Sequence, residues 1–320
     1  MPSSLLKVLS VVIFLGACTS TSRNTTQNLQ SHSTDTLVTM QPALDSDNKP
    51  ASLMDLPQTQ YGGFVLKPGF YEAEFKTYCL QPGTPDPSAR DAYVQSPVTG
   101  HRKDIVESVL LNSRENPEIG QRNIQLLLWS VVSGSDFNKL SPAVKADASK
   151  LLTFKQIFEL KGGVIGMIKT VSNSTGILNA NRDMQRLFEM SANSYEAFER
   201  LAVLKEPSQI KRAGVKPDQW YRQKENYYVR YFPVSYQKVR IQVYVPDGLL
   251  DAENKLAGEY LVFDPTGEQA NPAYTNAQRL GIGAPVKEII RVIIEVNKRK
   301  PDHKKAPEPK KREDRTVKQF

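Results

Sequence analysis

The sequence predicts an α+β protein with a helical middle section, short strands before it and a C-terminal region of antiparallel strands. Three patterns support this prediction. Residues 61–80 combine Gly-Gly and Pro-Gly pairs with alternating apolar positions, which is typical of short strands. Apolar residues then recur at helical spacing from residue 103 onwards, and a two-residue alternation returns after residue 207.

Local signals define the helices. One helix is expected from Lys103 to the residue before Pro117. A second, over about residues 117–132, is apolar almost all round, which indicates a buried central helix.

Capping residues mark two further helices. Ser141-Pro142 fits an N-cap followed by proline at the first helical position, and Thr153 with Gln156 fits a capping box. A long amphipathic helix is expected over Arg182–Glu206, because its apolar residues lie near one stripe.

Three stretches predict the later strands, YYVRYF, KVRIQVYV and EYLVF. The stretch Val286–Val296 is compatible with either helix or strand. The aromatic residues of 220–236 fit a partner surface or a half-buried sheet equally well.

The N-terminus predicts export and a lipid anchor. Lys7 precedes a short apolar segment, Val8–Leu15, and small residues follow, as in a secretory signal peptide over residues 1–17. The run Leu-Gly-Ala-Cys resembles a bacterial lipobox, which would make Cys18 the lipidated first residue of the mature protein. Thr19, in place of Asp, implies an outer-membrane lipoprotein. The alternative is an ordinary signal peptide with a chance cysteine.

The predicted domain organisation has five parts. Residues 1–17 form the signal peptide and residues 18–60 a flexible, lipidated tether, because residues 19–60 contain no aromatic residue and no glycine. Residues 61–206 form a mainly helical region and residues 207–296 a strand-rich region. Residues 297–320 form a basic, disordered tail.

The charge of the chain is concentrated in that tail. It carries ten Lys or Arg and four Asp or Glu, so it supplies +6 of the overall +8. A solvated end is the plainer interpretation, and a segment that binds an anionic envelope polymer is the alternative. Nucleic acid is not expected as a partner, since the tail lacks interleaved aromatic residues.

Several kinds of chemistry have no signature in the sequence. The three histidines are His32, His101 and His303, and only His101 lies in the predicted folded region. A histidine-based zinc site would need a second such ligand. No phosphate-binding glycine motif or Gly-x-Ser-x-Gly motif is present. We therefore expect no metal and no cofactor.

Two residues remain to be explained. If Cys18 carries lipid, Cys79 has no partner cysteine within the chain. Gln125 shares a helix face with Leu128 and Trp129, and a glutamine amide is costly to bury there without partners. A thiol that displaces ammonia from a glutamine side chain would join the two in an internal thioester.

These residues carry a resemblance to a known family. Tyr78-Cys79-Leu80, then Leu110-Leu111-Asn112, then Ile124-Gln125 with Trp129, is similar over about residues 61–135 to the thioester domain of Gram-positive surface adhesins. The resemblance implies a thiol at Cys79, an acyl donor at Gln125, and Tyr78, Asn112 and Trp129 around the bond. It implies covalent reaction with amines on a partner. This chain departs from the pattern after Asn112, at Ile124 and in its lipobox.

Other interpretations stay open at this point. Cys79 could be an inert buried residue, and Gln125 a core glutamine bonded to backbone. A catalytic thiolate at Cys79, activated by His101, would make the protein a cysteine enzyme. The functional predictions are an outer-membrane lipoprotein that acts as a structural, assembly or binding component and has an envelope protein or polysaccharide as partner, a covalent adhesin-like protein, and a cysteine enzyme. The face of the membrane is left open.

Overall fold

The structure, a computed structural model, describes residues 49–88, 91–162, 194–205, 217–272, 277–286 and 293–294. These residues lie within one structural unit, residues 35–320. The predicted signal peptide, the tether up to residue 48 and the basic tail lie outside the described residues. Cys18 therefore has no structural account.

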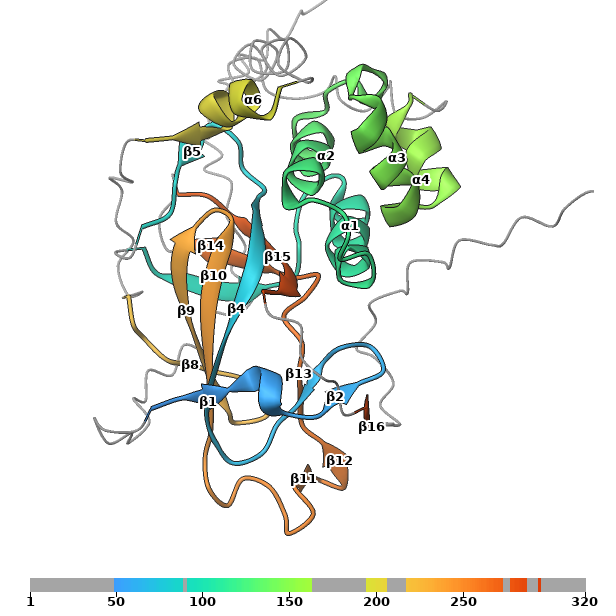
Figure 1. Cartoon of the computed structure of the whole chain (residues 1–320). Helices are drawn as coiled ribbons and strands as arrows, with labels where there is room; N and C mark the ends of the chain where they lie inside the picture. Colours follow the sequence, from blue (N-terminus) through green and yellow to red (C-terminus); the bar gives the residue numbers. More distant parts are fainter. Residues whose placement is uncertain are drawn as a thin grey trace, which may run out of the picture. The chain divides into compact units, whose positions relative to one another are not determined.

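The α+β prediction is confirmed, and its centre is a mixed sheet (Figure 1). Neighbouring strands are antiparallel in the order β6-β14-β15-β4-β10-β9-β8, and β1 adds a parallel pair to β4. The strands are β1 (Ala51–Ser52), β4 (Gly69–Cys79), β6 (Tyr93–Ser96), β8 (Tyr221–Arg222), β9 (Tyr228–Ser235), β10 (Lys238–Val245), β14 (Gln269–Pro272) and β15 (Leu280–Pro285).

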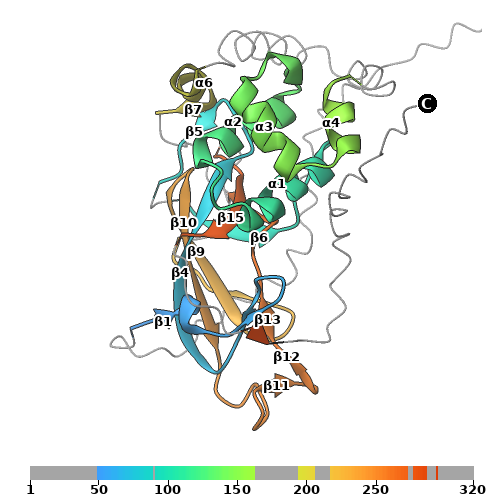
Figure 2. The same cartoon turned by 45° about the vertical axis from the view of Figure 1, so that its right-hand side comes forward.

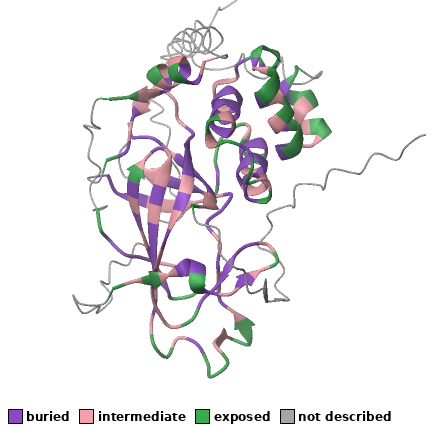
Figure 3. Ribbon diagram, in the orientation of Figure 1, coloured by how far each residue is buried: buried purple, intermediate pink, exposed green. Residues whose placement is uncertain are grey.

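The long strand β4 organises this sheet. It pairs with β10 over Gly69–Lys76 and with β15 nearer its end. Its alternate residues from Tyr71 to Phe75 are buried, and those between them are partly exposed. Figure 3 shows the same alternation along β9 and β10. The two-residue period of the sequence thus places one face of the sheet in the core.

Helices α1–α4 form one group beside the sheet (Figures 1 and 2). Helix α1 packs against β15, and α2 packs against both β4 and α3. The described helices are α1 (Lys103–Glu115), α2 (Gln121–Ser133), α3 (Pro142–Leu151), α4 (Phe154–Leu160) and α6 (Tyr195–Ala202).

The predicted helix boundaries hold for most of this group. The Ser141 side chain accepts from Val144 N at 3.3 Å, and the capping box between Thr153 and Gln156 is complete. Helix α2 ends where Gly134 takes a left-handed conformation at φ 70°, which glycine adopts without steric cost. The Ser141 cap and the Thr153–Gln156 capping box could be recognised in the sequence because each involves residues only three positions apart.

Smaller strand pairs complete the fold. They are β13-β3-β2-β16, in order Val262–Phe263, Phe64–Val65, Gln58–Thr59 and Ile293–Ile294, then β11 (Lys255–Leu256) with β12 (Glu259–Tyr260), and β5 (Thr84–Pro85) with β7 (Val203–Leu204). The ambiguous stretch Val286–Val296 contains the short strand β16, and its residues 287–292 and 295–296 lie outside the described part.

Two predicted boundaries were wrong. The tether does not extend to residue 60, because Leu53, Met54 and Leu56 are buried in the core. The predicted helix Arg182–Glu206 does not continue to Glu206. Helix α6 ends at Ala202 because the next two residues pair with β5, and residues 182–193 lie outside the described part.

Candidate functional site

The structure brings Cys79 and Gln125 together although 46 residues separate them in the chain. Cys79 is the last residue of β4, and Gln125 lies in the second turn of α2. Gln125 Oε1 accepts from the Cys79 backbone N–H at 2.8 Å, and Gln125 Nε2 donates to the Cys79 carbonyl oxygen at 3.0 Å. The side-chain amide is therefore fixed in orientation against the backbone of Cys79.

The reason for this contact lies in the edge of β4. Strand β10 stops pairing at Lys76, so the last residues of β4 have no strand on that side. Gln121 Nε2 donates to the Thr77 carbonyl at 3.1 Å, and the Gln125 side chain bonds to the backbone N–H and carbonyl of Cys79. Four helical residues rise about 6 Å and two strand residues about 6.7 Å, so glutamines at i and i+4 match alternate strand residues. Helix α2 thus completes the hydrogen bonding of β4.

Gln121 is the site residue that sequence reasoning missed. The signal was present, since two glutamines stand one turn apart at the start of a helix whose middle section is apolar. What could not be read from the sequence is that β10 would begin beside this position. Gln121 Nε2 also donates to the Gln237 carbonyl at 2.7 Å, which ties α2 to the turn before β10.

The site is closed to solvent. Cys79, Gln125 and Trp129 have exposed fractions of 0%, 1% and 0%. Burial raises the pKa of the Cys79 thiol to about 12, and contacts with the Trp129 side chain and the Gln81 backbone N–H partly offset that rise. The Trp129 indole N–H makes no hydrogen bond within the described residues, although it lies close enough to the Cys79 sulfur to lower the pKa of the thiol.

This environment does not favour a catalytic thiolate. Such a thiolate needs a lowered pKa, whereas burial moves the pKa of Cys79 upwards. His101, the predicted activating base, is an exposed residue in the turn before α1. The geometry gives the cysteine-enzyme prediction no partner for Cys79.

An aromatic cluster covers Trp129. Phe198 of α6 stacks on the indole with ring centroids 5.0 Å apart and an interplanar angle of 3°. Tyr195 and Tyr236 pack at 5.7 and 6.2 Å from it, each tilted by 32°. The face of α2 that carries Gln125 and Trp129 is thus closed by a helix remote in sequence.

The other two residues of the predicted environment have different neighbours. Tyr78 is buried on β4 and lies near Ser113 of α1, and burial raises the pKa of its phenol. Asn112 Nδ2 donates to the Leu151 carbonyl at 2.7 Å and so joins α1 to α3. Asn112 therefore takes part in helix packing, and within the described residues its hydrogen bonds do not reach Cys79.

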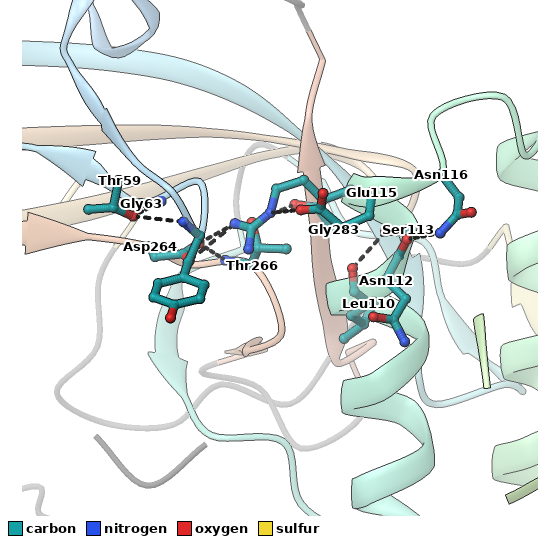
Figure 4. A network of polar contacts seen from close by, with 12 residues as sticks. Thr59, Gly63, Leu110, Asn112, Ser113, Glu115, Asn116, Asp264, Thr266 and Gly283 are labelled. Atoms are coloured by element: carbon teal, nitrogen blue, oxygen red, sulfur yellow. Dashed lines mark hydrogen bonds and ion pairs between the residues drawn. The ribbon is translucent and has the colours of Figure 1, made fainter. Parts of the chain in front are cut away.

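A second polar region surrounds Arg114 of α1. Figure 4 shows its neighbours Asp264, Thr266 and Glu115. Arg114 Nη1 donates to both carboxylate oxygens of Asp264 at 3.1 Å, and Asp264 Oδ1 also accepts from Thr266 N. The Arg114 guanidinium leaves no room for a side chain at Gly62, where an added Cβ would lie 2.8 Å from it. A buried ion pair therefore holds α1 to the loop after β13.

A cavity of about 460 Å³ lies against this region. Its lining includes Asp264 and Thr266 together with Glu107, Glu225 and Glu268. Gln95 Nε2 donates to Glu268, and the Tyr231 hydroxyl donates to Gln95. The cavity is in the usual size range of small-molecule sites. Most of its lining is uncharged, and its charged residues are these four carboxylates and Lys224.

Searches for other site types returned nothing in the described part of the chain. No group of three His, Cys, Asp or Glu side chains is arranged to hold a metal ion there. No helix in the same residues is both long and apolar enough to span a bilayer. In comparisons with known proteins, no family model, curated protein or solved structure matches this chain.

Proposed function

We propose that the protein attaches covalently to amines through an internal thioester between Cys79 and Gln125. The observation that carries the proposal is the pair of hydrogen bonds that fixes the Gln125 amide against Cys79 across 46 residues of chain. The same two residues are those that the adhesin resemblance implies. We further propose that the protein is a lipid-anchored envelope component, held through Cys18 at the outer membrane.

Formation of the bond requires no cofactor. The Cys79 sulfur attacks the Gln125 side-chain carbonyl carbon, a C–S bond forms, and the C–N bond breaks. The amide nitrogen leaves as ammonia with the thiol proton. Gln125 Oε1 already accepts the Cys79 N–H at 2.8 Å, and this donor would stabilise the oxyanion of the tetrahedral intermediate.

The second step transfers the acyl group to a partner. A primary amine attacks the same carbonyl carbon, the C–S bond breaks, and a proton from the amine passes to the sulfur. The products are an amide between Gln125 and the partner and a free Cys79 thiol. The N–H groups of Trp129 and Gln81 that approach the sulfur would stabilise the departing thiolate.

The bond would also stabilise the fold. By analogy with a disulfide, closing a loop of this length stabilises the native state by about 4 kcal/mol through the unfolded chain. The acyl group is protected from water because Gln125 is buried. A buried, closed site is what a stored electrophile needs before it meets its partner.

Intact mass tests the proposal directly. The full chain carrying Cys18→Ser is weighed before and after exposure to methylamine. We expect a mass lower by one ammonia, then a gain of one methylamine located at Gln125. Cys79→Ala and Gln125→Ala should abolish both changes, while Phe154→Ala, at an exposed position of α4, should keep them. The full unmodified mass, with Cys79 alkylated only after unfolding, would refute the thioester.

The acidic cavity favours a second candidate, a lipoprotein that binds its partner reversibly. Here the Cys79–Gln125 contact would be structural, and the cavity beside Asp264 would recognise a small group of an envelope protein or polysaccharide. Amine reactivity separates the two candidates, because reversible binding produces no covalent adduct. An anionic polymer of the envelope remains the proposed partner for the basic tail.

A further inference from the structure

We propose that α6 with β7 is a removable cover, and that Phe198 determines which nucleophiles reach Cys79 and Gln125. The chemical purpose of this cover rests on the proposed thioester. Its existence does not, because access to the Cys79 thiol can be measured without any thioester.

The cover contacts both elements that carry the site. On one side Phe198 stacks on Trp129, one helical turn after Gln125. On the other, the segment holds the loop that follows Cys79, since Gly83 N donates to Ala202 O at 2.8 Å and Asp86 N to Leu204 O at 3.0 Å. No nucleophile can approach between α2 and this loop while α6 bridges them.

Within the described residues, the cover is held by a small set of contacts. Helix α6 has eight residues, too few to persist in water without docking. Its buried side consists of Tyr195, Phe198 and Ala202. The β5–β7 pair adds two residues on each strand, and the Arg122–Glu196 ion pair is largely exposed and so contributes little. A segment with so few anchors opens at a lower free energy than the core.

One edge of the cover is polar. The Tyr195 and Tyr236 hydroxyls share a hydrogen bond of 2.5 Å, and Tyr236 also donates to Glu199. Gln237 Nε2 donates to both phenolic oxygens at 3.0 and 3.1 Å. Each of these bonds can be replaced by one to water when α6 lifts, which lowers the cost of opening further.

The cover would select among nucleophiles by controlling their access to the acyl group. With α6 docked, Phe198 and Trp129 keep water from the acyl group and limit hydrolysis. With α6 displaced, an amine presented by a partner surface reaches the carbonyl carbon. Truncation of Phe198 should therefore speed hydrolysis and open the site to amines in free solution.

A reversible staple tests the cover. Thr84 and Val203 are direct partners in the β5–β7 pair, so Thr84→Cys with Val203→Cys places two cysteines at a separation suited to a disulfide. In the full chain with Cys18→Ser and Gln125→Ala, Cys79 is a free thiol, and its alkylation is followed by peptide mass. We expect the oxidised staple to slow alkylation at least about tenfold, and reduction to restore it.

Phe198 variants provide a second measurement that needs no staple. Phe198→Ala should speed alkylation of Cys79 by about tenfold or more, Phe198→Leu should fall between it and the parent, and the exposed Phe154→Ala should change nothing. Thermal unfolding of each variant separates local from global opening. Equal alkylation rates in the oxidised, reduced and Phe198→Ala proteins would overturn the cover.

The outcomes distinguish this inference from the proposed function. Alkylation of Cys79 that depends on the staple in the Gln125→Ala protein, together with a full unmodified mass for the protein that keeps Gln125, would support the cover and refute the thioester. Loss of ammonia in the protein that keeps Gln125, together with alkylation that is equally fast in the oxidised and reduced Gln125→Ala protein, would support the thioester and overturn the cover.

Discussion

The two polar regions of the molecule, one at Cys79 and one around Arg114, differ in their exposure to solvent. At Cys79 the backbone N–H and carbonyl are buried and are paired with the Gln125 amide, and the neighbouring Trp129 ring is stacked on Phe198. Around Arg114 the charged groups pair with one another beside an open cavity. The first region is closed to solvent, whereas the second is lined by groups that solvent reaches. The proposed covalent reaction would therefore require part of the fold to move, and the proposed reversible binding would not.

Breaking the Arg114–Asp264 pair should give the largest loss of stability. The Arg114 side chain is 6% exposed and that of Asp264 is 24% exposed, so Arg114→Met leaves a partly buried carboxylate without its cation. We expect a loss of about 3 kcal/mol in the free energy of unfolding, measured by urea denaturation.

The matched control is Lys150→Ala, which removes the exposed ion pair with Glu118 and should cost less than about 1 kcal/mol. Equal effects of the two substitutions would show that Arg114 is not a structural charge. In that case the Arg114–Asp264 pair would contribute no more to stability than an exposed ion pair.

Removing the Gln125 amide should have the next largest effect on stability. Gln125→Ala leaves the N–H and carbonyl groups of Cys79 buried without partners, at a cost of about 2 kcal/mol even if no thioester forms. If the thioester forms, the loss should be larger, because loop closure is also lost. Chemical denaturation with the mass measurement separates the two contributions.

Stability at alkaline pH tests the burial of the Cys79 thiol. Burial raises the pKa of Cys79 from 9.0 to about 12, so the folded state retains the thiol proton that the unfolded chain releases. This stabilisation is complete below pH 9 and is lost as the pH rises towards 12, by about 1 kcal/mol at pH 10. The Gln125→Ala protein should lose stability over this range more steeply than the protein that also carries Cys79→Ala.

Asn112 should produce the smallest effect. Asn112→Ala removes one hydrogen bond to the Leu151 carbonyl and should cost about 1 kcal/mol, with no change in amine reactivity. Loss of the methylamine adduct at preserved thermal stability would show that Asn112 belongs to the reactive site after all.

Local signals in the sequence predicted much of the fold. The helices that begin at Lys103 and after Ser141, and the strand over residues 238–245, follow from capping and periodicity within a few residues. The end of α6 could not be predicted this way, because it depends on the pairing of Val203 with Thr84. The predicted end of the tether was wrong for a similar reason, since the few apolar residues near Leu53 are buried against residues distant in the sequence.

The candidate site was predicted in part. Cys79 and Gln125 were singled out in the sequence, and their contact through the Cys79 backbone fits the interpretation of a core glutamine bonded to backbone, while the thioester stays a prediction. The role of Gln121 depends on where β10 begins, and that of Phe198 depends on how α6 docks. Both are properties of the folded chain that no local pattern of residues carries.

The parallel pair between β1 and β4 has a mechanical consequence. Ala51 pairs with Tyr71 and Ser52 with Glu72, close to where the described chain begins at Lys49. A pull on the chain towards its N-terminus acts along β1, parallel to β4, and so loads these hydrogen bonds together in shear. Force that passes this pair enters β4, the strand that ends at Cys79. The proposed thioester between Cys79 and Gln125 would then hold the other end of β4 to α2 while the strand is under force.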